Sequence, residues 1–411
     1  MPLPRSMFSR SNPRDVDLEL VAGKWPSGLR GELFLASPDP RDEGPHSFFG
    51  DGVVYRISLE PGTHGAAEGR FALRHSKLMT PSRMLRERVP DAFAPTPVGT
   101  MSAFGPTNAA NTAPLPWDDR LLMTWDGGRP VEIDPISLEF LGEWGHRSSW
   151  LDLGPAYALP FIVAPAHPVT DPERNCIWSV SYKPGSRQVE VVRMDPDSER
   201  VRRWPLTNCA IPQLVHTISQ TRDWLILVDN AMKIDNAEAT GRPRSVTNNQ
   251  TEPVYLIRKA DLERTAPGQP VDVKRFKIGP ECMHFYADHD DSKGIRIFFE
   301  HSTDSDIGMS VRPGDHDLWG DPIDPAVAGM YGLAQSPPAV TLRSFDPETG
   351  KVTEQASFQD PELMWNVQTS AQDWSLEGLL KPTLHHVMYN GFRPEGITER
   401  QFDLYKHRID R

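Results

Sequence analysis

The stretch CIWSVSYKPGSRQVEVVRMDPDSERV (176–201) indicates how this chain is built. Two short runs rich in Val, Ile, Trp and Tyr flank a Pro-Gly turn, and the second run ends at an Asp-Pro pair. β-Branched and aromatic runs bounded by turn residues predict an antiparallel hairpin. An Asp-Pro turn that leads into a further strand is typical of the outer hairpin of a propeller blade.

The same signals recur along the chain. The hairpins IDPISLEF (133–140) and FDPETGKV (345–352) repeat the pattern of MDPDSERV (194–201). Strands are predicted at 31–37, 53–59, 120–125, 176–182, 189–194, 223–229, 253–259, 294–300 and 339–345. Because the repeats are unevenly spaced, a β-sandwich with similar turns is an alternative interpretation. Helices are expected only at 82–89 and 398–411.

Composition supports an all-β protein with many loops. The 411 residues include 40 Pro and 30 Gly, which are spread along the whole length. Proline removes a backbone donor and breaks helix interiors, so long helices must be few. The prolines do not cluster into a linker, which predicts a single domain over residues 1–411.

Charge and apolar patterning exclude some classes of protein. With 44 Lys and Arg against 56 Asp and Glu, the formal net charge is −12, which argues against a nucleic-acid partner. The most apolar stretch (156–165) is far too short to span a bilayer, and the N-terminus shows no secretory signal. Cys176, Cys209 and Cys282 are odd in number and far apart, so we expect reduced thiols in a cytoplasmic protein.

Three histidines are candidate metal ligands. His167, His216 and His284 each stand at or just before a strand-like run with apolar neighbours. The intervals of 49 and 68 residues are too wide for a zinc finger and suit one ligand from each of three blades. From the residues alone, three buried histidines of an ordinary core are the favoured interpretation, and a metal site is the alternative.

The chain resembles the carotenoid cleavage oxygenase family from about Gly31 to its end. The segments that carry the resemblance are GELFLASPDP (31–40), HSFFGDGVVYRISLEPG (46–62), NAANTAPLPWDDRLLMTWDGGRPVEIDPISLEFLG (108–142), AHPVTDPE (166–173), VHTISQTRDWLILVD (215–229) and MHFYADHDD (283–291). Each match alone is weak, but six in the same order as in the family form a specific signal.

The resemblance implies a fold, a cofactor and an activity. The fold would be a seven-bladed β-propeller, with loops and short helices forming a dome over an axial Fe(2+) site. His167, His216 and His284 would be iron ligands, and Asp126 would occupy the position of a carboxylate that orients one of them. The expected reaction is cleavage by O2 of a C=C bond in a small apolar conjugated substrate, giving two carbonyl products. Asp126 can equally be a turn residue before two glycines.

Two departures from the family pattern matter. The family's fourth histidine lies near the C-terminus beside Gly and an aromatic residue, whereas His385 and His386 lack that context. We therefore expect the last blade to be incomplete and the chain truncated, with His385 or His386 as the candidate stand-in. In the stilbene-cleaving branch a Lys precedes the carboxylate, and Trp125 replaces it here, which favours an apocarotenoid substrate.

Three further questions stay open at the level of sequence. The chain could instead be a retinoid-type isomerase and hydrolase at the same iron, or a metal-free propeller that binds a polyene. The segment MLRERVPDAFAPTPV (84–98) mixes basic and apolar residues and fits peripheral membrane contact, although a solvated helix and loop is the favoured interpretation. The sequence does not indicate an oligomeric state.

Overall fold

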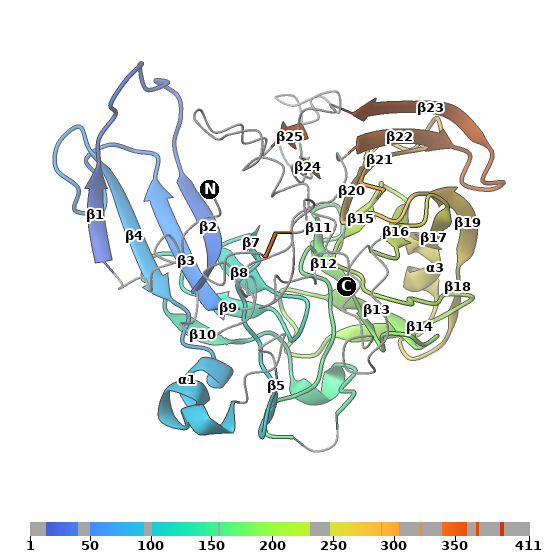
Figure 1. The fold of residues 1–411 in the computed structure, drawn as a ribbon, viewed down its shortest axis with the longest axis horizontal. Coiled ribbons are helices and arrows are strands. Elements are labelled where there is room, and N and C mark those ends of the chain that lie inside the picture. The colour runs from blue at the N-terminus through green and yellow to red at the C-terminus, as the bar shows by residue number, and fades with distance from the viewer. Residues whose placement is uncertain are drawn as a thin grey trace. The chain divides into compact units, whose positions relative to one another are not determined.

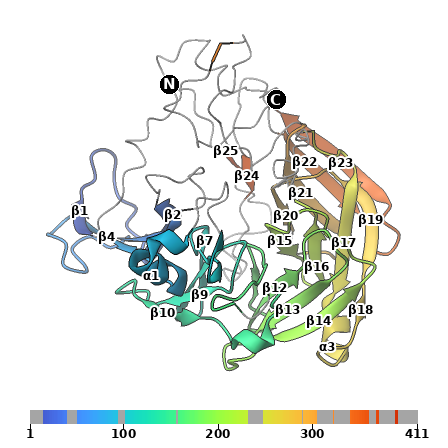
Figure 2. The same cartoon turned by 60° about the horizontal axis from the view of Figure 1, so that its bottom comes forward.

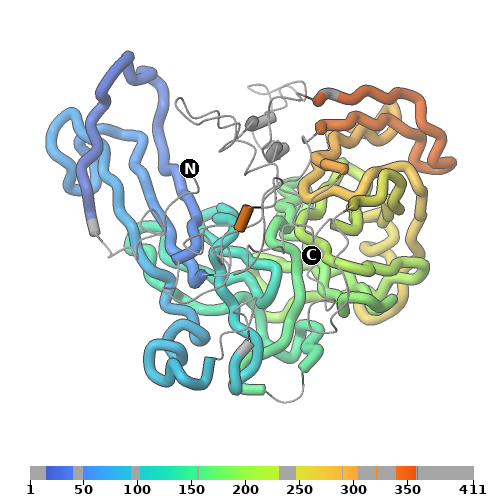
Figure 3. The backbone as a smooth tube through the Cα atoms, in the orientation of Figure 1, coloured from blue at the N-terminus to red at the C-terminus, as the bar shows by residue number. Residues whose placement is uncertain are grey.

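The computed structural model of the chain describes residues 14–39, 50–93, 101–154, 157–230, 247–288, 290–303, 321–322, 339–359, 367–369 and 387–389. Figure 3 traces the backbone as a tube. The chain divides into two compact units. The N-terminal unit comprises Arg5–Trp144 and Gly154–Phe161, and the C-terminal unit comprises Met1–Pro4, Gly145–Leu153 and Ile162–Arg411. The single domain expected over residues 1–411 stays a prediction.

The N-terminal unit contains two four-stranded antiparallel sheets (Figure 1). The first has the order β1-β4-β3-β2 and consists of β1 (Arg14–Leu18), β2 (Glu32–Asp39), β3 (Asp51–Ser58) and β4 (Phe71–Lys77). The second has the order β10-β9-β8-β7 and consists of β7 (Ala113–Trp117), β8 (Arg120–Thr124), β9 (Val131–Ile133) and β10 (Phe140–Glu143). A short pair, β5 (Met101–Ser102) and β6 (Gly105–Pro106), completes its described strands.

The apolar core of this unit packs the two sheets together through side chains such as Val54, Leu121 and Ile133. Gly52 allows a close approach of backbone, because a Cβ at this position would lie 2.4 Å from the carbonyl oxygen of Ala110. Glycine is therefore required where the 46–62 segment meets the 108–142 segment.

The C-terminal unit contains three sheets of five, four and four strands, each with its strands in near-sequential order. The first sheet consists of β11 (Val169–Asp171), β12 (Cys176–Tyr182), β13 (Val189–Met194), β14 (Arg202–Thr207) and β18 (Val271–Asp272). The second consists of β15 (Ile218–Gln220), β16 (Trp224–Val228), β17 (Glu252–Arg258) and β19 (Lys274–Gly279). The third consists of β20 (His284–Ala287), β21 (Ile295–His301), β22 (Ala339–Phe345) and β23 (Val352–Gln359). A fourth sheet is represented by the pair β24 (Val367–Thr369) and β25 (Val387–Tyr389).

The first strands of these sheets are neighbours. Strand β11 contacts β15, β15 contacts β20, and β20 contacts β24, and Figure 2 shows the sheets following one another in chain order. The second and third sheets pack face to face through an apolar cluster that includes Ile226, Phe285 and Phe299. Stacked four-stranded sheets with adjacent first strands are how propeller blades are built.

The strand predictions are confirmed. All nine overlap an observed strand, and the ranges 176–182, 189–194 and 339–345 coincide with β12, β13 and β22. The three predicted Asp-Pro hairpins connect β9 to β10, β13 to β14 and β22 to β23 in antiparallel register. In two of them the Asp side chain, Asp134 or Asp346, accepts backbone N–H groups of the turn, which explains the local signal. A mostly β fold is thus confirmed, while the count of seven blades stays a prediction.

Helices are few and short in the part of the chain that the structure describes. The predicted helix at 82–89 corresponds to α1 (Pro81–Arg88), which begins where Thr80 caps the N–H of Arg83. Another helix, α3 (Lys259–Arg264), was not predicted. Single 3₁₀ turns lie at Pro90–Ala92 and Arg147–Ser149. The helix predicted at 398–411 lies outside the described residues. Among the described helices, none has the length and apolar character needed to cross a bilayer.

Candidate metal centre

Each of the three large sheets of the C-terminal unit brings one histidine to the same place. His167 lies two residues before β11, His216 lies two residues before β15, and His284 is the first residue of β20. Because these first strands are neighbours, histidines far apart in sequence become adjacent. The sequence intervals suggested one histidine from each of three blades, and the structure places one histidine at or just before the first strand of each of three sheets.

The three imidazole rings form a compact triangle. Ring centroids are 4.8 Å apart for His167 and His216, 5.1 Å for His216 and His284, and 5.3 Å for His167 and His284. One nitrogen from each ring lies within 4.8 Å of the others. Three convergent imidazole nitrogens are a common donor set for divalent transition metals, Fe(II) among them.

Burial keeps the His167 and His284 rings in the form that binds metals. Desolvation, together with the adjacent His216 ring, lowers the pKa of His167 to about 3. The pKa of His284 is also well below its usual value, because the ring is buried and faces His216 and His167. Neutral imidazole is the metal-binding form, so His167 and His284 can bind a cation without first losing protons at neutral pH.

Glu300 orients the third ring. This buried residue of β21 faces His284 directly in the antiparallel register, and its Oε2 lies 2.9 Å from Nδ1 of His284. A carboxylate on one ring nitrogen fixes the tautomer and directs the other nitrogen outward. The sequence offered no signal for Glu300, since its neighbours in GIRIFFE mark only a strand.

The junction between the His167 and His216 segments (residues 167–171 and 216–220) is called here the first seam. Main-chain atoms join its inner end: the N–H of His167 donates to the carbonyl of His216 at 3.0 Å, and the N–H of Ile218 donates to the carbonyl of His167 at 3.2 Å. These bonds form a short parallel bridge. These main-chain hydrogen bonds therefore fix the positions of His167 and His216 relative to each other along the chain direction.

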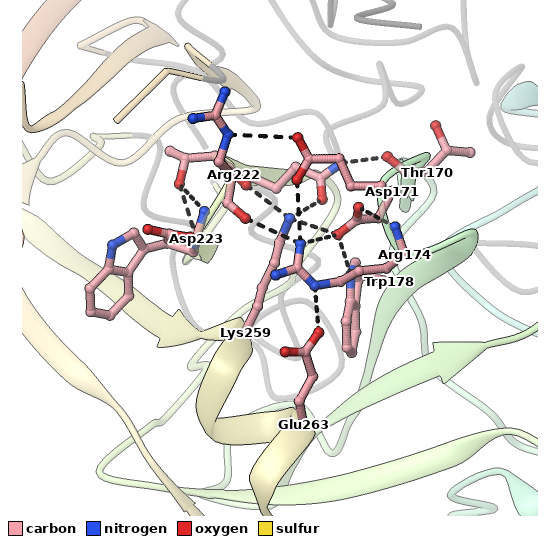
Figure 4. A network of polar contacts seen from close by, with 12 residues as sticks. Thr170, Asp171, Arg174, Trp178, Arg222, Asp223, Lys259 and Glu263 are labelled. Carbon is pink, nitrogen blue, oxygen red and sulfur yellow. Dashed lines mark hydrogen bonds and ion pairs between the residues drawn. The ribbon is translucent and has the colours of Figure 1, made fainter. Parts of the chain in front are cut away.

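A buried ion pair closes the outer end of the first seam (Figure 4). Lys259, from α3, is fully buried and donates from Nζ to Oδ2 of Asp171, Oε1 of Gln220 and the carbonyl of Thr221, each at 2.8 Å. Trp178 donates to the same carboxylate at 3.0 Å. Burial alone would raise the pKa of Asp171, but the Lys259 charge and these hydrogen bonds hold that pKa below its usual value. The carboxylate is therefore ionised at neutral pH.

The other predicted site residues are placed as follows. Asp126 follows β8 in the N-terminal unit, is half-buried, and precedes Gly127 and Gly128. Gly128 has φ +129° and a Cβ there would lie 2.5 Å from the Asn108 side chain, so the turn itself needs glycine. His385 and His386 lie outside the described residues, directly before β25 in sequence.

Family comparison agrees with this arrangement. The profile of the retinal pigment epithelial membrane protein family (RPE65) matches residues 8–370 and therefore covers both units and all three histidines. The chain belongs to this family. The resemblance to carotenoid cleavage oxygenases noted from the sequence is thereby confirmed.

Curated relatives of this RPE65-family chain are oxygenases by name. It is 24% identical over 357 residues to the apocarotenoid-15,15'-oxygenase of Synechocystis sp., covering 78% of this chain and 68% of the relative. It is 27% identical over 248 residues to resveratrol cleavage oxygenase 1 of Chaetomium globosum, covering 53% of this chain and 36% of that relative.

Solved structures show the same fold. The lignostilbene dioxygenase of Pseudomonas brassicacearum superposes with a TM-score of 0.56 at 18% identity, covering 88% of this chain and 70% of that one. Cobalt-substituted apocarotenoid oxygenase of Synechocystis superposes with a TM-score of 0.54 at 17% identity, covering 88% and 72%. At these identities the likeness concerns the fold.

Proposed function

We propose that this chain is a non-haem Fe(II) dioxygenase that uses O2 to cleave a C=C bond of an apolar conjugated substrate into two carbonyl products. The observation that carries the proposal is the convergence of His167, His216 and His284 from three sheets of an RPE65-family chain. The names of the two curated relatives, an apocarotenoid oxygenase and a resveratrol cleavage oxygenase, support the same class of reaction.

In this proposal the three histidines hold the iron. Neutral imidazoles such as those of His167 and His284 fit Fe(II), and the Glu300 contact at Nδ1 leaves Nε2 of His284 as its ligand atom. The bound iron supplies the activation of O2 that oxidative alkene cleavage requires. The chain's own contribution is to fix the rings, exclude water and position one double bond beside the metal. No side chain has to act as a nucleophile.

We further propose a fourth ligand and a supporting carboxylate. His385 and His386 directly precede β25, which pairs with β24, and β24 contacts β20, the strand that begins with His284. That topology makes either histidine a candidate fourth ligand. Asp126 is proposed, from the family resemblance alone, to orient one of the ligand rings.

The finer features of the proposal concern fold, substrate and location. We propose a seven-bladed propeller, of which the observed sheets are blades. Trp125, in place of a stilbene-branch Lys, favours an apocarotenoid over a stilbene. Cys176, Cys209 and Cys282 are buried free thiols, which supports a cytoplasmic location.

The decisive experiment loads the full chain with Fe(II) under anaerobic conditions and measures iron per chain, then adds O2 with an apocarotenal or with resveratrol. We expect about one iron per chain, oxygen uptake and carbonyl products. His167→Ala is the metal-binding control and should lose the iron. An isomerised product without oxygen uptake would favour the isomerase alternative, and full cleavage activity in His216→Ala would exclude the proposed site.

A further inference from the structure

The junction between the His216 and His284 segments (residues 213–219 and 281–287) is called here the second seam. Side chains make the hydrogen bonds that cross it. Thr217 donates from Oγ1 to the carbonyl of Met283 at 3.3 Å, and the N–H of Ala287 donates to Oγ of Ser219 at 2.9 Å. The central element of this seam is Asn230, which follows β16 and is completely buried.

The Asn230 side chain uses all of its hydrogen-bonding capacity on the two ligand segments. Oδ1 accepts from the N–H of His216 at 2.7 Å and from the N–H of Thr217 at 3.4 Å. Nδ2 donates to the carbonyls of Cys282 at 2.8 Å and Met283 at 2.7 Å. An amide has two acceptor sites and two donor hydrogens, so all four are engaged.

The backbone of Asn230 is fixed as well. Its N–H donates to the carbonyl of Leu214 at 2.8 Å, and its main chain forms a parallel bridge with Cys282. Asn230 is thus anchored to Leu214, two residues before His216, and to Cys282, two residues before His284. Displacing it would let those segments move apart, and with them the imidazoles that they carry.

We propose that Asn230 is a positioning residue that sets the separation of the His216 and His284 rings for metal binding. This inference rests on the proposed metal centre. Asn230 bonds to the backbone N–H of His216 and to the carbonyls of Cys282 and Met283, directly before His284, so it acts on the two rings through the backbone that carries them. An amide suits this role because it accepts on one side and donates on the other, whereas Asp would set a carboxylate against two carbonyl oxygens.

The test replaces Asn230 by Asp, which keeps the shape and removes both donors. We expect Co(II) to bind the wild-type chain with a visible d–d absorption, and Asn230→Asp to bind it about 10- to 100-fold more weakly with an altered spectrum. In the metal-free protein, hydrogen–deuterium exchange over residues 214–218 should be faster in the variant, because repulsion between the new carboxylate and the carbonyls of Cys282 and Met283 displaces the oxygen that accepts the His216 N–H.

Asn111→Asp is the matched control. Asn111 is a buried Asn of the N-terminal unit that donates from Nδ2 to the carbonyl of Gly50 at 2.6 Å. It should lose stability yet keep wild-type Co(II) affinity, spectrum and exchange over 214–218. If Asn230→Asp does not fold, the uncharged Asn230→Ser is measured in the same way.

The outcomes separate the two proposals. Wild-type Co(II) affinity and unchanged exchange in Asn230→Asp or Asn230→Ser would overturn the role of Asn230 while leaving the metal centre intact. A wild-type chain that binds neither Co(II) nor Fe(II) would overturn the metal centre, and the role of Asn230 with it, whatever the exchange shows.

Discussion

The two seams between the histidine-bearing segments are joined by different kinds of hydrogen bond. The first seam has main-chain hydrogen bonds beside His167 and His216 and a buried ion pair at its outer end. The second seam is spanned by side chains, above all the amide of Asn230. Backbone pairing tolerates most substitutions, whereas a side-chain bridge is lost with one residue. The comparison predicts that stability is most sensitive at the first seam and site geometry at the second.

The largest effect is expected from Lys259→Met in the first seam. It removes the buried cation nearest to Asp171 and leaves only the longer contact with Arg174, at 3.3 Å; breaking a buried pair typically costs about 3–5 kcal/mol in the free energy of unfolding. Urea denaturation measures this cost. Because the seam's main-chain bonds remain, metal affinity of the folded variant should change little. The double variant Lys259→Met with Asp171→Leu should recover part of the loss; no recovery would show that the ion pair itself is not the cause.

Asp229 tests electrostatics beside the second seam. Burial raises the pKa of Asp229 to about 7, despite hydrogen bonds from Gln213, whose side chain also donates to the buried Glu281. The folded state therefore binds the Asp229 proton more tightly than the unfolded state. Ionising this buried carboxyl lowers the free energy of unfolding, and that loss is absent below about pH 4 and complete above about pH 7. Asp229→Asn should raise the free energy of unfolding at pH 8 by up to about 4 kcal/mol, and much less at pH 5.

Asp134→Asn is the control of opposite sign for that pH series. Backbone N–H groups of Ser137 and Ile136 lower the pKa of Asp134, so its carboxylate contributes stability above its usual pKa. Its replacement should cost stability at pH 8. Equal pH profiles for the two variants would contradict the assignment of Asp229.

Glu300→Gln tests the support of the candidate ligand His284 within its own sheet. The change keeps the shape but removes the charge that faces Nδ1 of His284, and loss of such a partner typically weakens metal binding about 10- to 100-fold. Competitive Co(II) titration gives the affinity. Glu354→Gln, on β23, is the control because Glu354 is an exposed acceptor of a Ser344 hydrogen bond. Unchanged affinity in Glu300→Gln would argue against its role in orienting the ring.

The smallest effect is expected from Ser219→Ala in the second seam. It leaves the buried N–H of Ala287 without its Oγ acceptor, which costs about 1–2 kcal/mol in the free energy of unfolding. Differential scanning calorimetry detects a loss of this size. Thr353→Val, on the exposed part of β23, should be nearly neutral. A neutral Ser219→Ala would mean that the second seam depends less on side chains than proposed.

Sequence predicted the outer strands better than the inner ones. Runs such as CIWSVSY and AVTLRSF are long enough to carry a β pattern, and Asp134 and Asp346 mark hairpins by local hydrogen bonds. The first strands β11, β15 and β20 have only three or four residues, which is too short for a pattern of their own. Their histidines were found through neighbouring apolar runs and the family motifs.

The residues that support the candidate site were missed for a common reason. Lys259 ends the run PVYLIRK and looks like an ordinary solvated lysine, yet its partner Asp171 lies 88 residues away. Asn230 bonds across 14 and 53 residues. Their roles arise from the stacking of sheets, which a local sequence pattern does not encode. The α3 helix was missed because six residues give too little periodicity.

The origin of the three rings in three separate sheets has a consequence for the order of folding. The rings can meet only after long loops have closed and all three sheets have docked, so the triangle is a late feature of the folding pathway. An ion bound there would stabilise only the fully docked state, by mass action. The bound ion would then act as a reversible cross-link between the sheets. Its dissociation rate would measure how often the least stable sheet opens.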